Sequence, residues 1–282
     1  MHSIPILALL FLTLASAAFA SDGVLEINQT CAVQTGCFAG DTAGLPVTID
    51  GGAGRSYRMT SDLVISNELT NGILVGADNV SIDLGGFEIR GPVVCSGTPV
   101  VCTPAVEFGG VGVSVSSVRS GTSERNGSIR GMGAGVALGA QTEITQVRFR
   151  WNAEGGIIVG SGSNIESNTV YQNGFNGIQV GAGSTISGNT TYLNRADGIS
   201  AGLGTMISGN TAYQNAGVGI RAASGATVLG TAVRSNTGFG LDLGSQSGYR
   251  ENVISGNTAG TVTGTGFVNL GNNACNGTTT CP

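Results

Sequence analysis

Apolar residues recur in the second half of the chain at a fixed interval of 21 residues. Each interval contains a glycine followed by an aliphatic residue, as in Gly177–Ile178 and Gly198–Ile199. A second apolar residue stands two positions after the aliphatic one, so apolar side chains flank one outward position, as they do in a β-strand. The units share one phase, with marker glycines Gly135, Gly156, Gly177, Gly198, Gly219 and Gly240.

Two more apolar columns keep the same interval. One comprises Ile144, Ile165, Ile186, Ile207 and Val228. The other comprises Phe149, Val170, Thr191, Ala212, Val233 and Ile254. Three short apolar stretches per unit predict three strands per unit, and a unit this short cannot bury its own apolar face. Stacked coils with parallel pairing solve this problem. The pattern therefore predicts an all-β fold, a right-handed parallel β-helix solenoid with about 21 residues per coil.

Asparagines mark the turns of the predicted coils. The first column is Asn152, Asn173, Asn194, Asn215, Asn236 and Asn257. The second is Asn168, Asn189, Asn210 and Asn252, interrupted by Val147 and Thr231. Stacked amides can donate to one neighbour and accept from the other, and asparagine tolerates a left-handed backbone. We therefore expect a structural asparagine ladder. Ligand binding is the alternative role for these amides.

Composition narrows the functional classes. The chain has 282 residues, of which 49 are glycine and 10% are charged, while 40% are hydrophobic. This hydrophobic content argues against disorder, and the glycines lack the three-residue period of collagen. The net charge of −5, without a basic run, excludes a nucleic-acid partner.

The first twenty residues, MHSIPILALLFLTLASAAFA, predict a signal peptide cleaved after Ala20. An uncleaved membrane anchor is the alternative, but the apolar run is short for a bilayer span and no basic cluster follows it. No later segment is apolar enough to cross a membrane. The expected location is therefore outside the cell or in the periplasm.

Six cysteines form three close pairs in the sequence: Cys31 and Cys37, Cys95 and Cys102, Cys275 and Cys281. An even number in an exported chain predicts disulfides, and we expect neighbours to pair, although six cysteines allow fifteen arrangements. Zinc is the competing interpretation, but the mature chain has no histidine. The expected organisation is a signal peptide at 1–20, an N-terminal cap at 21–71, the β-helix at 72–262, with regular coils at 135–260, and a C-terminal cap at 263–282. Disulfides would pin the caps.

The pattern Ile-x-x-Asn-x-x-x-x-Asn-x-x-x-Gly-Ile, as at Ile186, Asn189, Asn194 and Gly198, resembles the β-helix repeat of pectate-lyase-like proteins. The resemblance covers about 135–260 clearly and implies the fold. It is weak evidence for activity, because this fold carries lyases, hydrolases, epimerases and adhesins.

The catalytic sets of that family are missing from the chain. Lyases of this kind neutralise a carboxylate of the substrate with Ca²⁺ or a basic residue, and they use Arg or Lys as the base. Hydrolases of this fold use a trio of aspartates near a histidine, and epimerases use an Asp, a Pro and a His together. The chain has no lysine, no Asp-Asp pair, and a single histidine, His2, in the predicted signal peptide. Glu143 with Glu166, and Arg221 with Asp242, are more typical of surface groups than of catalytic dyads. We therefore predict no catalytic residue, no metal site and no cofactor.

One outward column has a distinct composition. Tyr171, Tyr192 and Tyr213 share a repeat position, and Arg150 and Arg234 occupy it on the flanking coils. An exposed line of Arg, three Tyr and Arg suits an extended acidic polysaccharide, whereas the alternative is an aromatic ladder that only stabilises the sheet. The sequence predicts an exported, non-catalytic protein that binds polysaccharide or has a structural or adhesive role. The alternative is a polysaccharide lyase, hydrolase or epimerase. The oligomeric state stays open.

Overall fold

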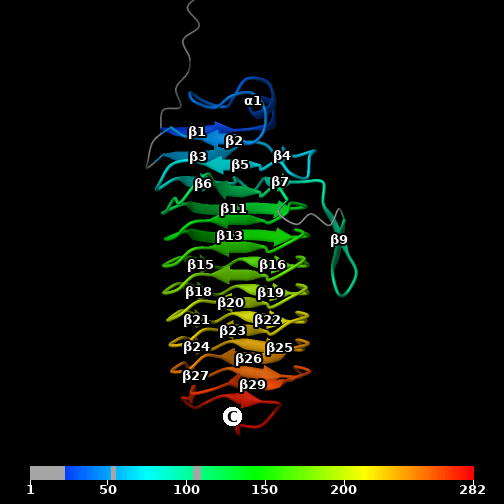
Figure 1. Cartoon of the computed structure of the whole chain (residues 1–282), viewed down its shortest axis with the longest axis vertical. Coiled ribbons are helices and arrows are strands. Elements are labelled where there is room, and N and C mark those ends of the chain that lie inside the picture. The colour runs from blue at the N-terminus through cyan, green and yellow to red at the C-terminus, as the bar shows by residue number, and fades with distance from the viewer. Residues whose placement is uncertain (1–22, 52–54, 104–108) are drawn as a thin grey trace, which may run out of the picture.

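The protein is a long stack of parallel coils (Figure 1), described here from a computed structural model that covers residues 23–51, 55–103 and 109–282. Each coil has three faces. The first face is a ten-stranded sheet, and the second and third faces together form a nineteen-stranded sheet. The predicted signal peptide lies outside the described residues. In the described ranges, no helix is long and apolar enough to span a bilayer.

The strands of the three faces follow one another along the stack. The first face contains β2 (Val47–Ile49), β5 (Ile73–Val75), β10 (Val113–Val115), β12 (Val136–Leu138), β14 (Ile157–Val159), β17 (Ile178–Val180), β20 (Ile199–Ala201), β23 (Ile220–Ala222), β26 (Phe239–Leu243) and β29 (Gly260–Gly264). The second face contains β1 (Val24–Ile27), β3 (Ser56–Met59), β6 (Ser81–Asp83), β15 (Asn164–Glu166), β18 (Thr185–Ser187), β21 (Met206–Ser208), β24 (Thr227–Leu229), β27 (Gly248–Arg250) and β30 (Val268–Asn269). The third face contains β4 (Leu63–Val64), β7 (Glu88–Arg90), β16 (Thr169–Tyr171), β19 (Thr190–Tyr192), β22 (Thr211–Tyr213), β25 (Ala232–Arg234), β28 (Val253–Ser255) and β31 (Ala274–Cys275). The strands β11 (Ser123–Arg130) and β13 (Glu143–Arg150) run through both the second and third faces.

The 21-residue interval becomes the register between neighbouring coils, which confirms the predicted fold class. Ile178 pairs with Ile199 across β17 and β20, and Ile199 pairs with Ile220 of β23. All three side chains are 0% exposed. Residues one interval apart are therefore neighbours in one continuous core, and their burial supplies the hydrophobic stabilisation that a single coil lacks.

The marker glycines are needed because the backbone of the next coil passes very close to them. A Cβ at Gly198 would lie 2.7 Å from the Nδ2 of Asn215, the carbonyl oxygen of Gly219 and the Oγ1 of Thr191. A Cβ at Gly177 would lie 2.6 Å from the carbonyl oxygen of Gly198. The glycine column thus leaves the space into which the asparagine side chains fit.

Each coil turns at three corners, and each corner has a residue with positive φ. The first corner, between the first and second faces, has Gln141, Gly162, Gly183, Gly204, Gly225 and Gln246. The second corner, before the third face, has Gln146, Ser167, Gly188, Gly209, Gly230 and Glu251. The third corner, after the third face, has Trp151, Gln172, Leu193, Gln214, Ser235 and Gly256. Glycine, which adopts this conformation without a steric penalty, is thus common at two corners and rare at the third.

The parallel pairing extends past the expected 72–262 range at both ends. β1 pairs with β3 and β2 pairs with β5, and at the other end β30 and β31 pair with β27 and β28. Most of the two predicted cap regions therefore contributes further coils. At the N-terminal end the regular interval does not reveal them because insertions change the coil length, including the helix α1 (Gln29–Gln34), which lies at that end of the stack (Figure 1). At the C-terminal end β31 keeps the 21-residue interval, since Ile254 pairs with Cys275.

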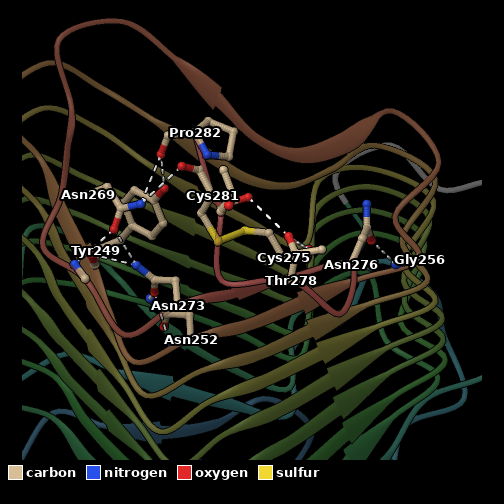
Figure 2. The surroundings of a disulfide bond; sticks show 12 residues. Tyr249, Asn252, Gly256, Asn269, Asn273, Cys275, Asn276, Thr278, Cys281 and Pro282 are labelled. Atoms are coloured by element: carbon tan, nitrogen blue, oxygen red, sulfur yellow. Dashed lines mark hydrogen bonds between the residues drawn. A yellow bond between two sulfur atoms is a disulfide. The ribbon is translucent and has the colours of Figure 1, made fainter.

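The cysteines pair with their sequence neighbours, as expected. Cys31–Cys37 lies beside α1, and Cys95–Cys102 joins β8 (Val94–Ser96) to β9 (Val101–Thr103) in an antiparallel hairpin. Cys275–Cys281 fastens the last residues over the C-terminal coil (Figure 2). There the Tyr249 hydroxyl donates to the carbonyl of Pro282, and Nδ2 of Asn269 donates to the carbonyl of Cys281.

Candidate functional site

The first asparagine column forms the predicted ladder. In each step the Nδ2 of one side chain donates to the Oδ1 of the next, with distances of 2.9–3.0 Å from Asn152 to Asn257. Nδ2 of Asn194 also donates to the backbone carbonyl of Val170, and its Oδ1 accepts from the backbone N–H of Asn173. These side chains are buried, so they satisfy the backbone at the third corner rather than meet a ligand.

The second asparagine column behaves in the same way and extends further than the sequence indicates. Asn168 donates to Asn189, and Asn189 donates to Asn210. At the interruption, the Oγ1 of Thr231 donates to Oδ1 of Asn252 at 2.8 Å. Asn252 then donates to Asn273, which lies in the expected C-terminal cap (Figure 2).

The tyrosines share one outward column on the third face, which we call the tyrosine row: Tyr171, Tyr192 and Tyr213. Tyr171 pairs in register with Tyr192, and Tyr192 with Tyr213. The row is half-buried, and the neighbouring inward residue of β16, Val170, is fully buried. Arg150 and Arg234 are in register with the two ends of the row, as the sequence predicts.

The tyrosine rings do not offer their faces to a ligand. Tyr171 and Tyr192 stack with centroids 4.7 Å apart and an interplanar angle of 3°, and Tyr192 and Tyr213 stack at 4.9 Å and 7°. The coil spacing leaves no room for another ring between them, so a ligand cannot insert between the tyrosine faces. The outward groups of the row are ring edges and phenolic hydroxyls.

Those hydroxyls are free to bind. In the described part of the chain, no hydrogen bond occupies the hydroxyl of Tyr171, Tyr192 or Tyr213. Burial and the two neighbouring tyrosines raise the pKa of Tyr192, while Arg148 and Arg150 lower it by less. The hydroxyl of Tyr192 therefore stays protonated at neutral pH, and it can both donate and accept a hydrogen bond.

The arginines at the two ends of the row differ in their surroundings. The guanidinium of Arg234 lies 5.4 Å from the ring centroid of Tyr213 and is exposed. The guanidinium of Arg150 lies 4.4 Å from the ring centroid of Trp151 and 3.1 Å from Oε1 of Glu88. Arg150 is therefore held by its own neighbours, whereas Arg234 is available to solvent.

The same outward column continues toward the N-terminus, which sequence reasoning missed. Arg130 pairs in register with both Arg90 and Arg150, and Nε of Arg130 lies 2.8 Å from Oε2 of Glu88. Burial raises the pKa of Glu88, but hydrogen bonds from Arg130 and Arg150 outweigh it and hold that pKa below its ordinary value. The 21-residue interval does not reveal this column, because the spacings from Arg90 to Arg130 and from Arg130 to Arg150 differ from that interval.

The β8–β9 hairpin lies beside this column, along the third corner, and we call it the arm (Figure 1). Its inner residues Val93, Cys95, Val100 and Cys102 form an apolar cluster of their own, against which Trp151 and Ala153 pack. Near its tip, the arm and the third corner enclose a mainly apolar hollow of about 390 Å³. The sequence predicts the insertion and its cysteine pair, but it does not predict the position of the arm against the third corner.

The remaining candidate groups lie at separate places on the surface. Arg221 is paired with both Asp197 and Asp242 on the first face, and its side chain is about half exposed. Glu143 and Glu166 stand on adjacent coils at positions two residues apart, and both are exposed. Within 23–51, 55–103 and 109–282, no group of three or more His, Cys, Asp or Glu side chains could hold a metal ion.

One buried acid has no counterpart in the sequence predictions. Glu124 lies in the inward column between Ile82 and Ile144, is 0% exposed, and has no hydrogen-bond partner on either carboxylate oxygen. Burial raises its pKa to about 8. The group is therefore mostly protonated at neutral pH and belongs to the core rather than to a surface site.

The fold is similar to that of a solved periplasmic epimerase. The periplasmic alginate epimerase AlgG superposes with a TM-score of 0.58 and 14% identity, over 89% of this chain and 83% of that chain. The catalytic domain of a GH87 α-1,3-glucanase superposes with a TM-score of 0.47 and 10% identity, over 85% of this chain and 55% of that chain. At such identities the likeness concerns the fold alone. No curated protein matches the sequence.

The regular coils also match a family model, "Right handed beta helix region", over residues 133–275. This match covers half of the chain and coincides with the coils that have the 21-residue register. The chain belongs to the right-handed β-helix family.

Proposed function

We propose that this protein is exported and binds an extended acidic polysaccharide along the third face, without modifying it. The observation that carries the proposal is the row of three stacked tyrosines, whose ring centroids lie 4.7 and 4.9 Å apart and whose hydroxyls form no hydrogen bond within the described part of the chain. A polysaccharide presents hydroxyl groups at regular intervals along its length. A line of donors and acceptors that repeats with each coil matches such a ligand.

Charge supports an acidic ligand. Arg148, Arg150 and Arg234 lie on the third face within one coil of the tyrosine row, and Arg90 and Arg130 extend the positive column. Within the part of the chain that the structure describes, Glu88 is the acid that forms ion pairs with these arginines, through Arg130 and Arg150. The chain as a whole has a net charge of −5, so this positive patch stands out from the rest of the surface. Guanidinium groups bind carboxylates through paired hydrogen bonds.

Export is supported by the three disulfides, which persist in oxidising compartments, and by the apolar N-terminal segment. The absence of catalysis is inferred from the sequence, which has no lysine and has its single histidine at His2. A structural or adhesive role at the cell surface is compatible with the same binding face.

An enzyme acting on polysaccharide is the second candidate. It is favoured by AlgG, which is named as an alginate epimerase and shares the fold. The two candidates differ in their products. An enzyme would release unsaturated or shortened sugars, or change the sugar composition of the polymer, whereas a binding protein leaves the polymer unchanged.

The test is a binding titration of the mature protein with a polyuronate and with a neutral glucan, with product analysis of both mixtures. Tyr192→Phe removes one hydroxyl and keeps the ring stack, so it should weaken polyuronate binding by about two- to tenfold, the value of one hydrogen bond. Arg234→Ala should weaken it as well. Arg250→Ala, which removes an exposed arginine from the second face, is the matched control and should bind like the wild type.

Unchanged polyuronate binding in both Tyr192→Phe and Arg234→Ala would refute the proposal. Equal affinity for the polyuronate and the neutral glucan would refute its acidic part. Formation of unsaturated, shortened or altered sugar products would instead support the second candidate, an enzyme that acts on polysaccharide.

A further inference from the structure

The arm and the third corner enclose the hollow next to the tyrosine row. Its walls include Pro99 and Val100 from the arm tip, and Leu193, Gln214, Ala216 and Thr237 from successive coils. Leu193 directly follows Tyr192, and Gln214 directly follows Tyr213. The hollow therefore lies next to the tyrosine row on the coils of Tyr192 and Tyr213. Its volume of about 390 Å³ falls within the range of small-ligand sites, roughly 300–1,000 Å³.

The arm is fixed in place rather than loose. Its base packs on Trp151 and Ala153 through an apolar cluster, and the Cys95–Cys102 disulfide ties its two strands together. The indole Nε1 of Trp151 donates to Oε1 of Gln172 at 3.0 Å, which links the cluster to the next residue of the third corner. The wall that faces the hollow is thus preorganised, which lowers the entropy lost when a ligand binds.

Near the hollow, the third corner has side chains at its positive-φ positions, whereas the other two corners have glycine. At the coils that line the hollow, the first corner has Gly183 and Gly204, and the second has Gly188 and Gly209. The third corner instead has Leu193 with φ 55°. A leucine in the left-handed region is strained, and glycine would relieve the strain. Gln214 at the same corner also has positive φ, so Leu193 and Gln214 together give this part of the hollow a wall of side chains, and Leu193 is its apolar member.

From this geometry we infer that the hollow is a sugar-binding subsite, which holds one ring of the polysaccharide that lies along the tyrosine row. A pyranose ring is amphipathic, with an apolar C–H face and a polar rim. Leu193 and Pro99 receive the C–H face, and Gln214 receives part of the rim. This inference rests on the proposed function and adds that one sugar residue is bound more tightly than the rest.

The decisive variant is Leu193→Gly. Because glycine is favoured at this φ, the variant should fold as stably as the wild type, so lost binding is not a folding defect. Ser235→Gly is the matched control, since it makes the same backbone change at the third corner, one coil beyond Gln214 and outside the lining of the hollow. The probes are a uronic-acid hexasaccharide and a neutral glucose hexasaccharide of the same linkage geometry, measured by isothermal titration calorimetry.

We expect Leu193→Gly to weaken binding of the uronic-acid hexasaccharide at least fivefold, and Ser235→Gly to leave it unchanged. Thermal unfolding should show no loss of stability in either variant. Wild-type affinity in Leu193→Gly, together with weakened binding in Tyr192→Phe, would reject the subsite and keep the binding row. Wild-type affinity in Leu193→Gly, Tyr192→Phe and Arg234→Ala alike would reject the proposed function as well. Equal weakening in Leu193→Gly and Ser235→Gly would assign the effect to the backbone and also reject the subsite.

Discussion

The asparagine ladder makes a quantitative prediction about stability. Replacing Asn194 with alanine removes four hydrogen bonds of the buried amide. Its Nδ2 donates to Asn215 and to the carbonyl of Val170, and its Oδ1 accepts from the backbone N–H and the Nδ2 of Asn173. At about 1 kcal/mol net per hydrogen bond, the loss is about 4 kcal/mol. The backbone N–H of Asn173 is left buried without its partner, which adds to that cost.

The assay is urea unfolding of the mature protein, followed by circular dichroism. Asn164→Ala is the control, because Asn164 is a half-exposed residue on β15 and its side chain has no internal hydrogen bond in the described part of the chain. The control should change the free energy of unfolding by less than about 0.5 kcal/mol. If Asn194→Ala costs less than about 1 kcal/mol, or no more than Asn164→Ala, the ladder does not stabilise the coils as argued.

Three further predictions follow from the core and the ends. In the folded state the pKa of Glu124 is about 8, whereas in the unfolded chain it is near 4.5. Because the unfolded chain releases this proton at lower pH, the free energy of unfolding should fall as pH rises between these values, on the order of 5 kcal/mol in total. Urea unfolding at several pH values should show this loss in the wild type and not in Glu124→Leu, and parallel curves for the two proteins would contradict it. Gly198→Ala should destabilise the fold by several kcal/mol, because the added Cβ meets three atoms at 2.7 Å, and thermal unfolding close to that of the wild type would contradict the close packing. The double variant Cys275→Ser with Cys281→Ser should speed amide hydrogen exchange in β31 more than in β17, and uniform exchange would show that the disulfide does not anchor the C-terminal coil.

The sequence predicts the coils because the same residue types recur at a fixed interval along the chain. Gly198, Ile199 and Asn194 each recur at the same spacing, and a parallel stack is the simplest structure that makes such residues neighbours. The N-terminal coils are assigned to the cap because insertions such as α1 break the interval there. β31 keeps the interval, since Ile254 pairs with Cys275, but its inward position has a cysteine in place of the aliphatic residue that marks the column.

The candidate site could be predicted only in part. The column from Arg150 to Arg234 follows from the interval, but the stacking of Tyr192 on its neighbours depends on ring orientation, which spacing alone does not give. Arg130 and Glu88 stayed hidden because the coils that hold them differ in length. The place of the arm depends on the packing of Trp151 under the hairpin, a contact between segments about fifty residues apart.

A crystal structure of the mature protein with a bound uronic-acid hexasaccharide tests the central claim most directly. We predict that the sugar chain runs parallel to the axis of the stack on the third face, with hydrogen bonds to the hydroxyls of Tyr171, Tyr192 and Tyr213. A hexasaccharide bound on the first face, or on the third face without contact to these hydroxyls, would contradict the account.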